Sequence, residues 1–414
     1  MKTPMISIVR TIGPCAPLAM GLVVSLLLLA QQYPVVGAQP SPLHPAGTHL
    51  RYHVTNLGPF TAAAINNRGQ VLLNRQTIKS PAGNGLEYDP GPDSFTRQTY
   101  LWQGGHRSQI GPFSGFESAD GVGIDGVFLN NAGQVIGDIQ IYGVSEQAPP
   151  NATLDASYFP YLWQSGHFQR LDTPRRDQSL TFPGQGERLL NDRGQVVLVT
   201  IDNGSSDSLA FPGGNVILWD HGRQQELGQP YPSGSSMVNA LNNRGLIVGQ
   251  DRSETSSGHA FCWQILGRGR GAGGHKRLQG RDLGTLGGRM SAAYDINDAG
   301  WIVGLSDTKE NSTGRFEEHA CLWHNGRVQD LGTLPGQTYS GAAAINSRGQ
   351  IVGQSGSRAF LYQAGRMRDL NDLIPAGAGW VLTKAIALND QGQIVGDGTF
   401  HGRAVSFLLT PTRN

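Results

Sequence analysis

The sequence predicts an all-β fold, a seven-bladed β-propeller with four-stranded blades, and three observations support this prediction. One hairpin motif returns seven times along the 414 residues, at intervals of 43 to 64 residues. A strand signal that usually ends in Trp follows the hairpins. The chain begins with a strand that has no blade before it and ends with a blade that lacks one strand. Repeats of this length indicate a supersecondary unit that must stack on its neighbours to bury its apolar face.

Each hairpin has a local cause, an Asn followed three residues later by Gly, as in Asn346 and Gly349. An Asn side chain bonds the backbone two residues further on, and Gly adopts the positive φ of a glycine bulge, so we expect type I turns. Short strands are expected on both sides of each turn, with 188–191 as the first strand of the third repeat. The seven motifs occupy residues 66–69, 130–133, 191–194, 242–245, 297–300, 346–349 and 389–392.

The two outer strands of each unit carry their own signals. The third strand is aromatic, as at Trp102, and five of the seven Trp residues stand in this position, which indicates a packing layer. The fourth strand is marked by an acid before a Leu, as at Asp282 and Asp330. The first strands are rich in Ala and suit the crowded axis, so we expect the strands to follow one another from the axis outward.

The two ends of the chain predict a closed ring. Residues 52–58 carry a fourth-strand signal, while the last repeat supplies only three strands and ends near Leu409. Pairing these segments would remove two open sheet edges. A β-solenoid is the structural alternative, although its coils are shorter and more uniform than these repeats.

The first 38 residues resemble a secretory signal peptide. Lys2 and Arg10 precede an apolar stretch over 16–30, and small residues precede Gln39, where we expect cleavage. A membrane anchor is the alternative, but the stretch is shorter than the ~20 residues that a spanning helix needs. We expect a linker at 39–50, the propeller at 51–411, a tail at 412–414, secretion to the exterior or the periplasm, and no membrane span in the mature protein.

The charge balance and the cysteine and histidine spacing argue against several kinds of partner and ligand. With 32 basic and 31 acidic residues, the formal net charge is +1, so no nucleic-acid partner is expected. Cys262 and Cys321 fall at adjacent motif positions on consecutive repeats, which predicts two separate buried thiols and no disulfide. No Cys/His spacing typical of a metal site occurs. We therefore expect no metal and no cofactor, and a monomer.

The later repeats resemble the bacterial extracellular HAF repeat, named after its His-Ala-Phe start. That start occurs unchanged at 259–261, and the run 319–353 carries the rest of the motif, whereas Arg358 departs from it at the first position. The resemblance covers 259–397 well and 52–250 in weakened form. It implies a secreted or cell-surface protein of propeller type, and it brings no catalytic residues to transfer.

A ring of such blades has two rims. The first-to-second and third-to-fourth turns share one, the turn rim. The second-to-third connections and the links between blades share the other, the loop rim, which holds insertions such as 75–99 and 139–159. Binding sites gather where insertions fall, and aromatic rings beside carboxylates suit a sugar. We therefore expect ligand-binding residues on the loop rim at Glu87, Tyr88, Asp89, Phe113, Phe116, Tyr142, Tyr158, Tyr231, Tyr339 and Trp380. Aromatics that only pin loops to the blades are the structural alternative.

Two functions remain open from the sequence, besides a purely structural surface repeat that has no small ligand. The first is a binding or scaffolding module for a carbohydrate or an envelope protein. The second is an envelope glycan hydrolase or lyase that uses loop-rim carboxylates, but no acid stands out by its context and no nucleophile elbow is present. His259 and His319 are available as bases, yet they recur within the third-strand pattern. That recurrence favours a hydrogen-bonding role in each blade, so no catalytic residue is assigned.

Overall fold

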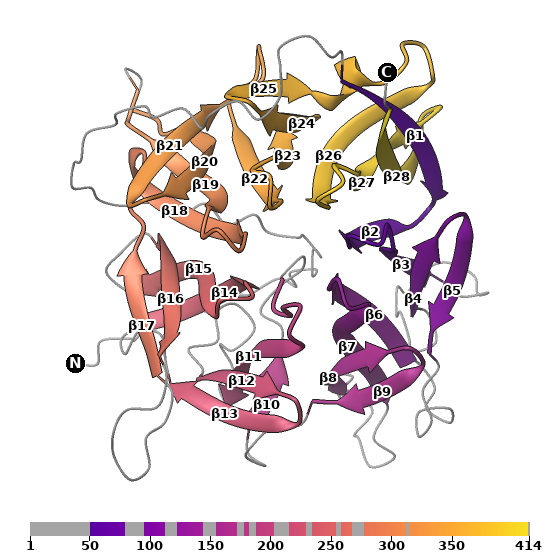
Figure 1. Ribbon diagram of the computed structural model, residues 1–414, viewed down its shortest axis with the longest axis vertical. Helices are drawn as coiled ribbons and strands as arrows, with labels where there is room; N and C mark the ends of the chain where they lie inside the picture. The colour runs from indigo at the N-terminus through magenta and orange to yellow at the C-terminus, as the bar shows by residue number, and fades with distance from the viewer. Residues whose placement is uncertain are drawn as a thin grey trace, which may run out of the picture.

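The computed structural model describes residues 50–78, 95–111, 122–143, 155–171, 178–181, 188–202, 215–228, 234–253, 258–266, 277–311 and 314–412. Viewed down its axis, the chain forms a ring of seven four-stranded antiparallel sheets (Figure 1). The predicted seven-bladed β-propeller is therefore confirmed. The expected signal peptide lies outside the described residues, as does nearly all of the expected linker. No helix among the described residues is long and apolar enough to cross a membrane.

The first four blades run from the axis outward in chain order. Blade one contains β2 (Thr61–Ile65), β3 (Val71–Ile78), β4 (Phe95–Gln103) and β5 (His106–Ile110). Blade two contains β6 (Val122–Leu129), β7 (Gln134–Gly143), β8 (Asp155–Gln164) and β9 (His167–Arg170). Blades three and four contain β10 (Gln178–Thr181), β11 (Gln195–Asp202), β12 (Val216–Asp220), β13 (Arg223–Gly228), β14 (Gly234–Leu241), β15 (Leu246–Ser253), β16 (His259–Leu266) and β17 (Arg277–Asp282).

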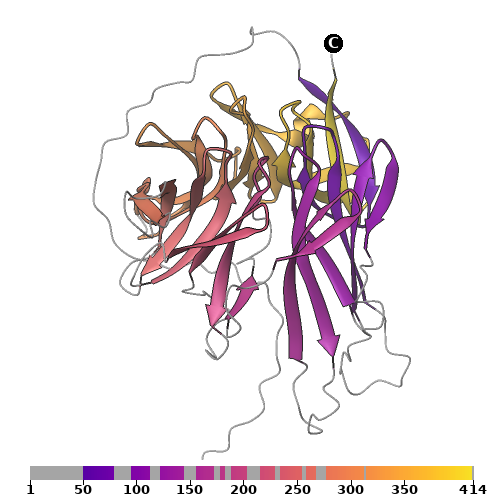
Figure 2. The same ribbon diagram turned by 60° about the horizontal axis from the view of Figure 1, so that its bottom comes forward.

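The last three blades complete the circle. Blades five and six contain β18 (Gly287–Ile296), β19 (Ile302–Thr308), β20 (Glu318–His324), β21 (Arg327–Gly332), β22 (Ser340–Ile345), β23 (Ile351–Ser355), β24 (Arg358–Gln363) and β25 (Arg366–Asp369). A 3₁₀ turn, η2 (Leu370–Leu373), leads to blade seven, which contains β26 (Trp380–Leu388), β27 (Ile394–Phe400) and β28 (Arg403–Thr412). Strands of blades one and two extend further on one side of the ring than those of the later blades (Figure 2).

The amino end closes the ring as predicted. Strand β1 (Arg51–Gly58) pairs antiparallel with β28 and becomes the outermost strand of blade seven. Tyr52 and Leu57 of β1 are 2% and 3% exposed, so the strand contributes to the core as well as to the sheet. This pairing excludes the open-ended solenoid.

The repeated turns have the predicted type I geometry with a glycine bulge. In blade six, the Gly349 amide donates to the Asn346 carbonyl at 3.1 Å, and the Asn346 amide donates to the Gln350 carbonyl at the same distance. Gly349 has a φ of +74°. A Cβ atom there would also lie 2.7 Å from the Trp301 ring, so both the backbone and the neighbouring blade require glycine.

Blade three departs from the prediction at its inner edge. The expected strand over 188–191 forms only isolated bridges at Arg188 and Leu190. The Arg188 amide donates to the Asn239 carbonyl at 2.7 Å, and the Leu241 amide donates to the Arg188 carbonyl at 2.9 Å. The Arg188 backbone thus pairs with β14 of blade four, while Leu190 still bridges to β11 of its own blade.

The histidines at the start of third strands have the predicted hydrogen-bonding role. His259 Nδ1 lies 2.8 Å from Asp282 Oδ2, and His319 Nδ1 lies 2.9 Å from Asp330 Oδ2. Hydrogen bonding to these aspartates raises the pKa of both histidines. Arg358, which departs from the His-Ala-Phe pattern, forms the same link to Asp369 at 3.0 Å.

The two cysteines confirm the expectation of separate thiols. Cys262 and Cys321 are both buried and free, and both contribute to the apolar layer between blades four and five. Burial raises the pKa of each thiol. Neither thiol is therefore a ready nucleophile at neutral pH.

Candidate binding site at the mouth of the central channel

A closed circle of asparagines surrounds the axis at the turn rim. Each Asn that opens a turn donates from Nδ2 to the main-chain oxygen of the equivalent Asn in the next blade, at 2.9 to 3.2 Å. The last bond, from Asn389 to Asn66, joins blade seven to blade one. Each of these side chains is buried, so the circle ties the seven blades together. Its members are Asn66, Asn130, Asn191, Asn242, Asn297, Asn346 and Asn389.

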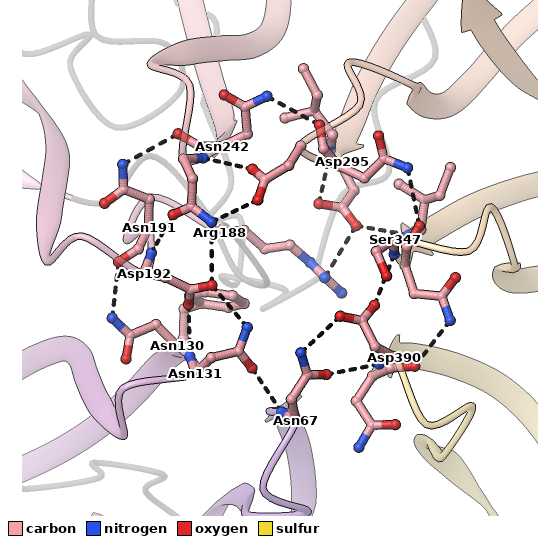
Figure 3. Close-up of a pocket in the computed structure, with 18 of the residues that line it drawn as sticks. Asn67, Asn130, Asn131, Arg188, Asn191, Asp192, Asn242, Asp295, Ser347 and Asp390 are labelled. Carbon is pink, nitrogen blue, oxygen red and sulfur yellow. Dashed lines mark hydrogen bonds and ion pairs between the residues drawn. The ribbon is translucent and has the colours of Figure 1, made fainter.

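The residues that follow these asparagines form the lip of the channel (Figure 3). Every lip residue is short and polar: Asn67, Asn131, Asp192, Asn243, Asp298, Ser347 and Asp390. At six of the seven junctions between blades, a lip amide donates to the side-chain oxygen of the next lip residue, at 2.7 to 2.9 Å. The remaining junction joins Asp298 to Ser347, whose side chain carries a hydroxyl in place of the amide or carboxylate. Hydrogen bonds between adjacent blades therefore fix the positions of the lip residues at all junctions but one.

The lip carboxyl groups accept hydrogen bonds from their neighbours but keep acceptor capacity. Asp192 Oδ2 accepts from Asn131 Nδ2 at 2.9 Å and from Asn243 Nδ2 at 3.3 Å. Partial burial opposes ionisation of Asp390. Hydrogen bonds from Ser347 and Asn67 outweigh it and hold the pKa of that carboxyl below its ordinary value. A carboxylate has about four acceptor positions, so these bonds leave room for donors from a ligand.

An apolar layer lies under the lip. The residue before each circle asparagine is Ile or Leu, and all seven are buried: Ile65, Leu129, Leu190, Leu241, Ile296, Ile345 and Leu388. Together with the lip and with Arg188, they line a cavity of about 160 Å³ on the axis. The cavity therefore has a polar mouth and an apolar wall.

The Arg188 side chain extends from blade three into the centre of the channel (Figure 3). Its Nη1 lies 3.1 Å from Asp295 Oδ2 of blade five, and its Nη2 donates to the Ile386 carbonyl of blade seven at 3.3 Å. Its guanidinium also lies 5.7 Å from the ring centre of Phe128 in blade two. Arg188 of blade three thus places one cation near the axis, where it contacts three other blades.

The Asp295 partner is fully enclosed. Burial raises the pKa of this carboxyl above its ordinary value, while Arg188 and the amides of Ile345 and Ile296 oppose the rise. Asp295 Oδ2 accepts from the Ile345 amide at 2.8 Å. Arg188 and the amides of Ile345 and Ile296 all contact the Asp295 carboxyl, which thereby fixes the position of the guanidinium.

The cavity suits a ligand that has hydroxyl groups at its edge and an apolar face. The lip offers carboxylate and amide oxygens as acceptors, and the Ile and Leu side chains offer a surface for stacking. Among the described residues, no group of three or more His, Cys, Asp or Glu side chains could hold a metal ion.

A second group of ionisable residues lies between blades one and two, nearer the loop rim. Asp125 of β6 and Asp138 of β7 are cross-strand partners, and Arg97 Nη1 lies 2.6 Å from Asp125 Oδ2. Asp138 Oδ1 is buried and has no hydrogen-bond partner within the described part of the chain. Burial, reinforced by the charge of Asp125, raises the pKa of Asp138 to about 7. A carboxyl of this kind keeps its proton near neutral pH.

The residues equivalent to Asp138 in two other blades accept a hydrogen bond from the backbone amide of the next blade. Asn74 in blade one accepts from the Gly126 amide of blade two at 3.0 Å. Asp397 in blade seven accepts from Ser406 at 2.6 Å and from the Ala62 amide of blade one. No equivalent donor to Asp138 is found among the described residues.

Most of the predicted loop-rim residues lie outside the described part of the chain: Glu87, Tyr88, Asp89, Phe113, Phe116 and Tyr231. Tyr142 and Tyr158 fall within β7 and β8, as strand residues. Tyr339 is 46% exposed and donates to the Gly356 carbonyl at 2.8 Å, and the Trp380 ring lies 4.8 Å from that of Phe400. A shared site on the loop rim stays a prediction.

The axial cavity was not predicted from the sequence. The signal for its lip was present, since the residue after each repeated Asn is Asn, Asp or Ser in all seven repeats. Arg188 was also visible as a charged residue in a strand position that is otherwise uncharged. Its contacts are with blades five and seven, far away in the sequence, and no local pattern indicates them.

No protein-family model matches the sequence, and no curated protein matches it. Solved structures match at the level of the fold. A Trypanosoma rangeli sialidase in complex with sialic acid is 10% identical, with a TM-score of 0.39, over 85% of this chain and 54% of that one. A Dyadobacter fermentans protein of unknown function is 11% identical, with a TM-score of 0.38, over 87% and 99%. A puromycin hydrolase is 14% identical, with a TM-score of 0.46, over 85% and 53%.

The chain thus spans about half the length of the sialidase and of the puromycin hydrolase. At identities this low, the likeness concerns the β-propeller fold alone. The function has to be argued from the site itself.

Proposed function

We propose that the protein is a secreted binding module that holds a carbohydrate at the mouth of its central channel. The observation that carries this proposal is the axial cavity of about 160 Å³, with its seven polar lip residues above an apolar wall. A cavity of this size accommodates one ring-sized group. The site is preorganised, because the lip side chains are already fixed by hydrogen bonds, and preorganisation lowers the entropy cost of binding.

Sugar chemistry matches the arrangement of the lip. Hydroxyl groups at the edge of a sugar ring donate to Asp192, Asp298 and Asp390, and hydrogen bonds to charged acceptors are stronger than those to neutral ones. The C–H face of the ring packs on the Ile and Leu side chains below. Arg188 closes the floor, so the ligand enters and leaves through the turn rim.

A glycan array followed by calorimetry tests this proposal. Asp298→Asn keeps the size of the side chain but removes its charge and the oxygen that accepts from Asn243 Nδ2, so affinity for the bound sugar should fall about tenfold, or ~1.4 kcal/mol. Asp372→Asn removes an exposed carboxylate away from the cavity and should leave affinity unchanged. Equal affinities of the two variants, or no binding by any glycan, would refute the axial site.

Asp138 supports a second candidate function, an envelope glycan hydrolase or lyase that acts on the loop rim. With a pKa of about 7, Asp138 meets the requirement for a general acid, and Asp125 supplies a second carboxylate beside it. A turnover assay decides this candidate. Turnover that is lost in Asp138→Asn, or on removal of Glu87 or Asp89, would support the enzyme, whereas binding without turnover would exclude it.

A further inference from the structure

The turn rim carries a concentration of exposed arginines around the axial cavity. Four of them occupy the same position of the repeated turn, directly after a lip residue: Arg68, Arg193, Arg244 and Arg348. Four more follow the third-to-fourth turns of blades one, three, five and six and form an outer circle: Arg107, Arg223, Arg327 and Arg366. All eight are exposed, and none forms an ion pair with a described residue.

The acidic groups on the same rim are fewer and already engaged. Among the described residues they are the three lip aspartates, which accept hydrogen bonds around the ring, and Asp220, which lies 2.7 Å from His221. Eight arginines against four aspartates leave an excess of positive charge on a protein whose formal net charge is only +1. The turn rim is therefore the positive face of a nearly neutral molecule.

We infer that the turn rim binds an acidic polysaccharide, a chain that carries carboxylate or phosphate groups as well as hydroxyls. This inference rests on the proposed function, because one sugar ring occupies the axial cavity. The neighbouring units lie across the rim, where their anionic groups meet the arginines. Arg pairs with carboxylate and phosphate through two parallel hydrogen bonds, so four arginines around one cavity match a repeating anionic chain.

The lip favours a polysaccharide over a nucleic acid. Three carboxylates line the mouth, and they repel a phosphate backbone that approaches the axis. An acidic polysaccharide fits both the lip and the arginines. Its hydroxyl groups donate to the lip residues, while its anionic groups contact the arginines that follow the lip residues in the chain. Binding should therefore depend on salt through the arginines and on hydroxyl groups through the lip.

The test compares two ligands that share one backbone, polygalacturonate and its fully methyl-esterified form. We expect the wild-type protein to bind polygalacturonate at least tenfold more tightly in 50 mM salt, and the advantage to shrink as salt rises. Arg68→Ala/Arg193→Ala should lower the slope of log K against log salt by about two, one for each arginine removed. Equal affinity for the two ligands would overturn the inference.

A matched control removes two exposed arginines from the other rim. Arg315 lies in the second-to-third connection of blade five, and Arg403 directly follows that of blade seven, so Arg315→Ala/Arg403→Ala lowers the net charge equally but should leave the salt slope unchanged. Identical behaviour of the two double variants would show attraction by net charge alone and would overturn the inference. A duplex DNA oligonucleotide that binds as tightly as polygalacturonate would do the same.

The two proposals fail in different ways. If the esterified chain binds and Asp298→Asn weakens it, but the arginine variants change nothing, only the acidic ligand class is wrong. If polygalacturonate binds through the arginines while Asp298→Asn has no effect, the axial sugar site is wrong. All these substitutions are at exposed side chains, and an unchanged melting temperature confirms that each variant is folded.

Discussion

The two rims of the propeller use the same turn for different purposes. Asn346 on the turn rim and Asn311 on the loop rim both open an Asn-x-x-Gly turn, and in both the Gly amide donates to the Asn carbonyl, at 3.1 and 3.0 Å. Asn346 also donates to Asn389 in the next blade, whereas Asn311 is exposed in the β19–β20 connection. The turn itself is local chemistry, and its placement at the axis makes it a link between blades.

Removal of residues 52–58 should have the largest effect on the ring. Blade seven would lose its outer strand, and Tyr52 and Leu57 would leave the core. We expect cooperative unfolding to be lost, which calorimetry and far-UV circular dichroism would show as a broad transition. A single sharp transition in the truncated protein would mean that the asparagine circle alone closes the ring.

Asp138→Asn tests a link between blades that is missing among the described residues. A carboxyl whose pKa is raised to about 7 binds its proton more tightly in the folded state than in the unfolded state. The stability of the wild type should therefore fall as pH rises from about 4 to about 7, by at most about 4 kcal/mol. The variant should lack this part of the pH dependence and be more stable than the wild type at pH 8.

Urea unfolding at a series of pH values measures this difference. Asp307 and Asp397 also have raised pKa values, so both proteins keep a residual slope of the same sign. Parallel pH profiles for the wild type and Asp138→Asn would show that Asp138 is ionised and satisfied in the folded protein.

The Asn346 and Asn311 turns can be compared directly by substitution with Ala. Asn346→Ala leaves the buried Asn389 carbonyl without its donor and the Arg348 and Gln350 amides without their acceptor. We expect it to cost about 3 kcal/mol, because each buried unsatisfied group costs about 1–3 kcal/mol. Asn311→Ala should cost less than about 1 kcal/mol, since water can take the place of an exposed side chain as a hydrogen-bond partner. Chemical denaturation measures both, and equal costs would show that the circle adds nothing to the turn.

Within one turn, Gly349→Val and Arg348→Ala separate backbone strain from surface charge. Valine at a φ of +74° is strained and would contact the Trp301 ring, so we expect a loss of about 2 kcal/mol. Arg348 is exposed, and its removal should change stability by less than about 0.5 kcal/mol. Equal melting temperatures for the two variants would contradict the turn geometry.

The sequence predicted what short-range chemistry determines. The Asn-to-Gly spacing, the third-strand aromatics and the unpaired strands at the two ends were sufficient for seven blades and their closure, because each signal acts within a few residues or must be matched elsewhere. The His259 and Asp282 signals likewise predicted strands that the structure joins by a hydrogen bond.

The axial site was harder to predict, since it depends on a break in the pattern. Arg188 belongs to a strand that fails to form, and its partners Asp295 and Ile386 are more than 100 residues away in the sequence. Sequence rules that act over a few residues do not predict contacts between a side chain and blades this far apart in the sequence. The loop rim was predicted from insertions, and the residues that would test it most directly lie outside the described part of the chain.

The position of Arg188 has a consequence for the rigidity of the ring. Its guanidinium contacts blades five and seven, which are not neighbours of blade three. A movement of either blade away from blade three would therefore have to break a contact at the axis as well as the contacts between adjacent blades.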